Sequence, residues 1–133
     1  MAATPQFVNA PNVGLTKFVT ADNTTVKTVF TPASSGSRIL ALFATSNDTA
    51  SRQFTIYLTR GGVRYQLDTF TIPGASSTQP TQNWNILDAE WMRWLDPNDP
   101  HLILPAGTTI EVGAVAAVTS GKEVSVIVMG GDF

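Results

Sequence analysis

The chain has 133 residues, no cysteine and a formal net charge of −2 at pH 7. This length suits one domain, expected over residues 1–133, with a hydrophobic core of its own. The lack of cysteine excludes disulfides and cysteine-ligated metals. Charged residues make up only 14% of the chain, against roughly 25% in an average soluble protein. A surface with so few charges favours contact with other proteins.

Nucleic acid and membrane are not expected as partners. The eight basic residues are scattered and form no stripe, whereas nucleic-acid binding needs clustered positive charge. No stretch approaches the ~18 apolar residues of a membrane span. Residues 1–11 carry no Lys or Arg and no long apolar run, so no secretory signal is predicted there.

The N-terminal segment contains Pro5 and Pro11 on either side of Phe7 and Val8. Proline fixes φ and removes a backbone donor, which predicts an extended arm over residues 1–12. A frayed terminus is the alternative. Phe7 and Val8 are apolar enough to require a surface on which to lie.

Short strands separated by turn residues are expected along the rest of the chain. Gly61-Gly62 has the backbone freedom that a two-residue hairpin turn requires. A shift of the apolar phase near Asp68-Thr69 predicts a β-bulge in the returning strand. The expected strands are 13–20, 25–31, 38–46, 52–60, 63–72, 83–86, 101–104, 108–118 and 123–129.

Two of these strands are apolar on both faces, which predicts that both faces are covered. In strand 38–46, alternation places Leu40 and Leu42 on one face and Ile39 and Phe43 on the other. In the last strand, the valines at 124, 126 and 128 share one face, while the residues at 127 and 129 occupy the other. One face of each strand meets the core, so the other needs the arm or a second subunit.

All three tryptophans lie within residues 83–99. We expect a short strand and then one helical turn near Asp88–Trp94, with Asp88 as its cap. A single helix over residues 84–95 is the rival, because Trp84, Leu87, Trp91 and Leu95 have the spacing of one helix face. Residues 83–86 are weak helix formers, which favours the strand and turn.

No catalytic or metal-binding pattern stands out. The single histidine, His101, has no G-x-S-x-G motif or other marker of an activated serine to accompany it. Segment 96–101 alternates side chains whose donor atoms suit a Ca²⁺ ion, namely Asp96, Asn98, Asp99 and His101. A hydrogen-bonded turn explains them better. We therefore expect no enzyme, no cofactor and no metal.

Trp91 and Trp94 have two interpretations. They suit a platform on which sugar rings stack, or they are anchors at a core edge or a subunit interface. We favour anchors, without deciding between core and interface. Arg60 and Arg64 flank the hairpin tip and suit either an acidic partner or a solvated hairpin.

The layout resembles that of small tailed-phage head decoration (cement) proteins with a jelly-roll fold. The resemblance rests on four segments that together span most of the chain. They are ATPQFV at 3–8, VFTPASSGSRI at 29–39, NILDAEW at 85–91 with LILPAGTTI at 102–110, and the final GGDF at 130–133.

This resemblance implies a non-enzymatic virion protein, made in the host cytoplasm. It would bind the outer capsid surface, bridge major capsid protein subunits and self-associate as a homodimer or homotrimer. A tail-fibre or baseplate module that binds host glycan through Trp91 and Trp94 is the alternative. The fold expected is an all-β antiparallel sandwich or jelly roll of about eight strands. The interface candidates are Phe7, Val8, Arg60, Arg64, Trp91, Trp94, Ile127, Met129 and Phe133.

Overall fold

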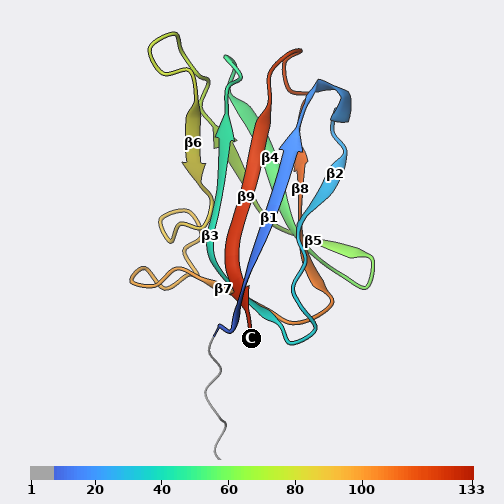
Figure 1. Ribbon diagram of the computed structural model, residues 1–133. Helices are drawn as coiled ribbons and strands as arrows, with labels where there is room; N and C mark the ends of the chain where they lie inside the picture. Colours follow the sequence, from blue (N-terminus) through green and yellow to red (C-terminus); the bar gives the residue numbers. More distant parts are fainter. Residues whose placement is uncertain (1–7) are drawn as a thin grey trace, which may run out of the picture.

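The computed structural model describes residues 8–133, which form two antiparallel β-sheets packed face to face (Figure 1). The predicted all-β sandwich is therefore confirmed. The strands are β1 (Ala10–Phe18), β2 (Val26–Phe30), β3 (Ser37–Ser46), β4 (Arg52–Arg60), β5 (Val63–Ile72), β6 (Gln82–Asn85), β7 (Leu102–Leu104), β8 (Thr108–Ala114) and β9 (Val124–Asp132), with a 3-10 turn, η1 (Thr20–Asp22), after β1.

One sheet has the strand order β1-β9-β3-β6, with β7 also paired to β3, and the other has the order β2-β8-β4-β5. We call them the front sheet and the back sheet. Alternate side chains of each sheet meet in one core. Its centre includes the Phe54 ring, which meets Phe18 edge-on at 5.2 Å and stacks on Phe70 at 5.7 Å between centroids.

The hairpin between β4 and β5 forms as predicted. Both turn residues, Gly61 and Gly62, have positive φ, of 59° and 77°, which matches the turn that suits two right-twisted strands. The ladder shifts register where Ile56 pairs with Asp68 but Tyr57 pairs with Gln66. Leu67 is therefore the extra residue, so the predicted bulge is present beside Asp68.

A second bulge corrects the phase predicted for β3. Ile39 pairs with Gly130 and Ala41 with Met129, so Leu40 is an extra residue in the strand. Consequently Ile39 and Leu42 are both buried on the core face, not on opposite faces as predicted. Leu40 points away and is 52% exposed.

The predicted arm over residues 1–12 is wrong at its C-terminal end. Residues 10–12 belong to β1 and pair with residues 130–132 of β9. Pro11 is compatible with this strand because β1 is an edge strand that pairs only with β9. Residues 1–7, including Phe7, lie outside the described part of the chain.

The stretch after β6 turns without forming a regular helix. Asp88 caps it as predicted, because its Oδ1 accepts from the Glu90 amide at 2.9 Å. The Asp88 carbonyl also accepts from the Met92 amide at 2.8 Å. The single helix over residues 84–95 is wrong, because Gln82–Asn85 is a strand paired with β3. The expected helical turn is a hydrogen-bonded turn only.

The two long sides of the sandwich differ. On one side β1 lies directly against β2, and a Cβ at Gly14 would come within 1.9 Å of the Val29 carbonyl oxygen. Side chains cross this seam: Thr16 and Lys27 donate to carbonyls of the neighbouring strand. The opposite side is bounded by the edge strands β5 and β6.

Candidate interaction surface

The outer face of the front sheet is apolar across three strands. The register sets Val13 beside Met129, and Leu15 beside Ile127, on β1 and β9. The same two β9 residues lie beside Ala41 and Phe43 of β3. Leu15 is 74% exposed, Val13 51% and Met129 46%. We call these six residues, Val13, Leu15, Ala41, Phe43, Ile127 and Met129, the apolar front.

Polar residues bound the apolar front at one end. The next row across the sheet is Lys17, Ser125 and Thr45. Lys17 Nζ lies 3.2 Å from a carboxylate oxygen of Glu123, and both side chains are largely exposed.

Strand β9 is apolar on both faces, as predicted. Val124, Val126 and Val128 face the core, while Ile127 and Met129 belong to the apolar front.

The outer face of the back sheet is different, because hydroxyl, amide and charged groups dominate it. The Oγ1 atoms of Thr55 and Thr69 lie 3.5 Å apart across β4 and β5. Glu111 of β8 is 8% exposed and lies 3.3 Å from the Arg64 guanidinium. A solvated face of this kind is normal for an antiparallel sheet, so the apolar front is the face that departs from expectation.

The hairpin arginines bind the protein's own back sheet. Arg60 Nη1 donates to Thr108 Oγ1 at 2.7 Å, and Arg64 contacts Glu111. The exposed apolar groups at this tip are Val63 and Tyr65, at 50% and 61%. A role for Arg60 and Arg64 in contacting a partner stays a prediction.

The tryptophans do not fill the core. Trp91 and Trp94 are 59% and 58% exposed, and Trp84 is half-buried. Leu87, Met92 and Leu95 of the same stretch are buried instead. No local pattern marks Met92 as buried, because its place in the turn depends on the hydrogen bond of its amide to the Asp88 carbonyl.

Trp84 and Trp91 line a cleft on the side of the sandwich that is bounded by the edge strands β5 and β6. Their ring centroids lie 5.5 Å apart with the planes tilted by 48°. The cleft has a volume of about 270 Å³, and its remaining walls are Asp68, Thr69, Phe70, Thr71 and Ile86. Trp94 is not among these residues. A sugar platform of Trp91 and Trp94 stays a prediction.

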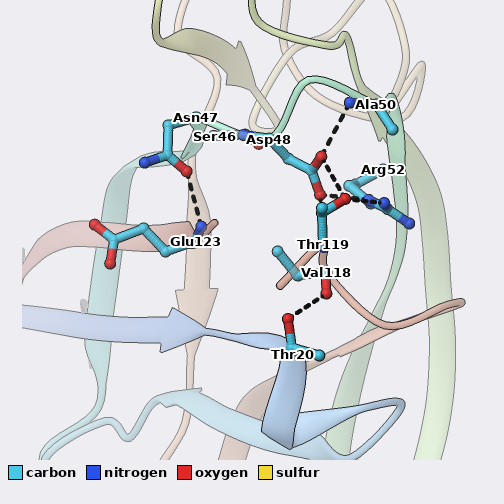
Figure 2. A network of polar contacts seen from close by, with 9 residues as sticks. All are labelled: Thr20, Ser46, Asn47, Asp48, Ala50, Arg52, Val118, Thr119 and Glu123. Carbon is cyan, nitrogen blue, oxygen red and sulfur yellow. Dashed lines mark hydrogen bonds and ion pairs between the residues drawn. The ribbon is translucent and has the colours of Figure 1, made fainter. Parts of the chain in front are cut away.

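A buried carboxylate ties together two loops at one end of the sandwich (Figure 2). Asp48, which is fully buried, accepts from the Ala50 and Thr119 amides at 2.9 Å each, from Thr119 Oγ1 at 2.8 Å and from Arg52 Nε at 2.6 Å. Burial on its own raises the pKa of Asp48, but these donors outweigh it and lower the pKa to about 2. Both carboxylate oxygens of Asp48 are therefore satisfied within the chain, which gives this cluster a structural role.

The two ends of the described chain meet. Val8 lies over Gly131, where an added Cβ would come within 2.0 Å of Val8 Cγ1. The Asn9 amide donates to the Asp132 carbonyl at 2.7 Å. Phe133 is half-buried, and its amide donates to the Gly36 carbonyl. Val8 and Phe133 are thus partly engaged within the chain, and their predicted interface role stays untested.

The loop at 96–101 is a hydrogen-bonded turn. Asp96 Oδ1 accepts from the Asn98 amide at 2.9 Å, and Asp99 forms an ion pair with Arg38 at 2.8 Å. Within residues 8–133 no three acidic, histidine or cysteine side chains are grouped as a metal site would need. The described residues also contain no helix long and apolar enough to cross a membrane.

No protein-family model matches the chain, and no curated protein matches it. Among solved structures, a chain of the virus-like particle of extra small virus from the giant freshwater prawn Macrobrachium rosenbergii is similar at 11% identity and a TM-score of 0.39. That match covers 100% of this chain and 86% of the other. A chain of infectious bursal disease virus, strain Gx, is similar at 13% identity and a TM-score of 0.36, over 97% of this chain and 34% of its own length. Likeness at this level carries no function across.

Proposed function

We propose that this protein is a structural virion component that decorates and stabilises a tailed-phage capsid. In this role it bridges major capsid protein subunits on the outer surface, associates with its own copies and performs no catalysis. The observation that carries the proposal is the apolar front, three strands wide, on a sandwich whose opposite face is polar.

The apolar front has the chemistry of a protein contact. Exposed apolar residues are ordinary when they are scattered, but a contiguous patch on one face marks an interaction site. None of its six side chains is charged. The ion pair at its border, between Lys17 and Glu123, has no net charge. Burying a leucine as exposed as Leu15 contributes about 2 kcal/mol. Many copies on one lattice add such contacts together.

Leu15→Glu tests the proposal, since it places a charge at the most exposed apolar position of the front. We expect it to weaken binding to purified phage heads that lack the protein by roughly tenfold or more. In the complex, an unpaired carboxylate would replace the leucine that binding buries. Co-sedimentation of the recombinant protein with the heads measures the binding.

Gln53→Glu is the matched control. It adds the same charge at an exposed position of β4 in the back sheet, and it should bind heads as the unmodified protein does. Equal binding by the Leu15→Glu protein would overturn the role of the apolar front. Recovery of the protein in purified tails and not in heads would overturn decoration and favour the glycan-binding tail module.

A further inference from the structure

Asp68 is a carboxylate on the core side of an edge strand. In β5 the alternate residues Phe70 and Ile72 are buried in the core, and Asp68 is the preceding residue of the same series. The ladder places it beside Ile56, which is fully buried. The bulge at Leu67 causes this placement, because one extra residue moves Asp68 into the inward phase.

Within residues 8–133 this carboxylate has no cationic partner. Its Oδ1 accepts from the Thr69 amide at 2.7 Å, and no ion pair involves it. Arg64, on the same strand, is engaged with Glu111 on the other face of the sheet. Asp68 is half-buried, and a counter-charge would stabilise a carboxylate that is partly removed from water.

The cleft beside Asp68 is lined by aromatic rings. Trp84 lies on the core side of β6, because it pairs with the buried Ala44. Its ring and that of Trp91 lie 5.5 Å apart. The negative faces of aromatic rings attract cations, and tryptophan does so more strongly than tyrosine or phenylalanine. No basic residue lines the cleft, so its charge and its rings both favour a positive group.

We propose that this cleft binds the guanidinium or ammonium group of an arginine or lysine side chain from a partner protein. Its volume of about 270 Å³ lies below the roughly 300–1,000 Å³ of pockets for drug-sized ligands, and suits one long side chain. That the partner is another virion subunit rests on the proposed function. Binding of the cation itself rests only on Asp68, Trp84 and Trp91.

Two small molecules test the cation requirement in the isolated protein. N-acetyl-arginine amide carries the guanidinium, and N-acetyl-citrulline amide is its neutral counterpart of nearly the same shape. The indole N–H signals of the three tryptophans in a ¹H–¹⁵N spectrum report binding. We expect the arginine compound to shift the Trp84 and Trp91 signals, the citrulline compound to leave them, and Trp94, outside the cleft, to serve as the internal reference.

Asp68→Asn should weaken binding of the arginine compound about tenfold, because it removes the charge and keeps the shape. Glu90→Gln removes the same charge from a neighbouring exposed position and should leave binding unchanged. The dispersion of the three indole signals shows whether each variant is folded. Should Asp68→Asn unfold the protein, Trp91→Ala, a truncation on an exposed turn, should abolish the response at Trp84.

Equal shifts from both compounds, or unchanged binding in a folded Asp68→Asn protein, would overturn the proposal. Shifts of Trp84 and Trp91 with methyl glucoside, without any with the arginine compound, would make the cleft a sugar site instead. These spectra need no capsid, so their failure leaves the role of the apolar front intact. Failure of Leu15→Glu to weaken head binding would in turn leave the cleft unaffected.

Discussion

At the scale of single residues, Asp48 shows how one side chain fixes the loops of a sandwich. Its carboxylate connects the turn after β3 with the loop between β8 and β9 (Figure 2). Every hydrogen-bond donor that faces it comes from these two loops or from Arg52 at the start of β4. A fully buried carboxylate in this position is tolerated only because each of its oxygens is satisfied.

We expect Asp48→Asn to lower the free energy of unfolding at pH 7 by about 2 kcal/mol, since hydrogen bonds to a charged acceptor are lost and the new amide meets donors. The lowered pKa gives the pH dependence. The contribution of Asp48 is complete above the unfolded-state pKa of 3.8 and is lost as the pH falls towards about 2. Urea unfolding at a series of pH values between about 5 and 2 measures both effects.

Asp96→Asn is the control for this prediction. Asp96 is exposed and caps the Asn98 amide, a role that asparagine also performs. Its variant should unfold like the unmodified protein at every pH. An Asp48→Asn protein with the same stability and the same acid-dependence as the original would contradict the structural role assigned to Asp48.

Sequence reasoning found the caps that act locally and missed those that act at a distance. Asp88 was predicted as a cap because its partner amide lies two residues away. Asp48 makes the same kind of local bond, to the Ala50 amide, but its two bonds with Thr119 join residues 71 positions apart, which no local pattern indicates. Asp68 was seen only as the neighbour of a bulge, because its orphan charge is evident only once the strands are paired.

At the scale of elements, local turn chemistry was decisive. The β4–β5 hairpin has the bounds that the sequence predicts, because Gly61-Gly62 fixes the register from within the turn. The phase of β3 was predicted wrongly, because the bulge at Leu40 lies opposite Gly130, which no local pattern connects to it. A Cβ at Gly130 would come within 2.2 Å of the Arg38 carbonyl oxygen, so this glycine permits the close approach.

The N-terminal boundary leads to a prediction about truncation. Removing residues 1–7 leaves every described pair between β1 and β9, whereas removing residues 1–12 deletes the pairs at 10, 11 and 12. The longer truncation also deletes the hydrogen bond from Asn12 Nδ2 to Asp132 Oδ1, at 2.9 Å. We expect it to cost about 2 kcal/mol, and the shorter one to leave the unfolding midpoint in urea unchanged.

Asn12→Ala distinguishes the contribution of this side chain to stability from the contribution of the strand pairing. It should cost about 1 kcal/mol, because the partly buried hydrogen bond to Asp132 and an exposed one to the Thr31 carbonyl are lost while the ladder remains. Equal stability of the two truncated proteins would show that the first three residues of β1 do not contribute. In that case the predicted boundary of the arm at residue 12 would regain support.

At the scale of the whole molecule, the sandwich has one apolar and one polar outer face. Its class was predictable, since short alternating strands and frequent turns are typical of β-sandwiches. The apolar front was predicted only in part. Ile127 and Met129 were identified from their own strand, but Val13 and Leu15 were missed, although the alternation Val13, Leu15, Lys17 was a usable signal.

The chemistry of the apolar front also predicts how association depends on salt. Contacts between apolar faces do not weaken when mobile ions screen charges. Self-association measured by sedimentation velocity should therefore be equal or stronger when NaCl is raised from about 0.05 M to about 1 M. A dissociation constant that rises tenfold over this range would indicate a charged interface on another part of the surface.

The meeting of the two ends sets how the fold bears mechanical load. Ala10 and Asp132 are paired neighbours at one end of the β1–β9 ladder (Figure 1). Tension applied at these two positions would separate β1 from β9 one residue pair at a time, beginning at this end. Tension directed along the strands of the front sheet would instead load the ladder in shear and would have to break many hydrogen bonds together. The fold therefore resists load directed along its strands and yields when it is pulled by its two ends.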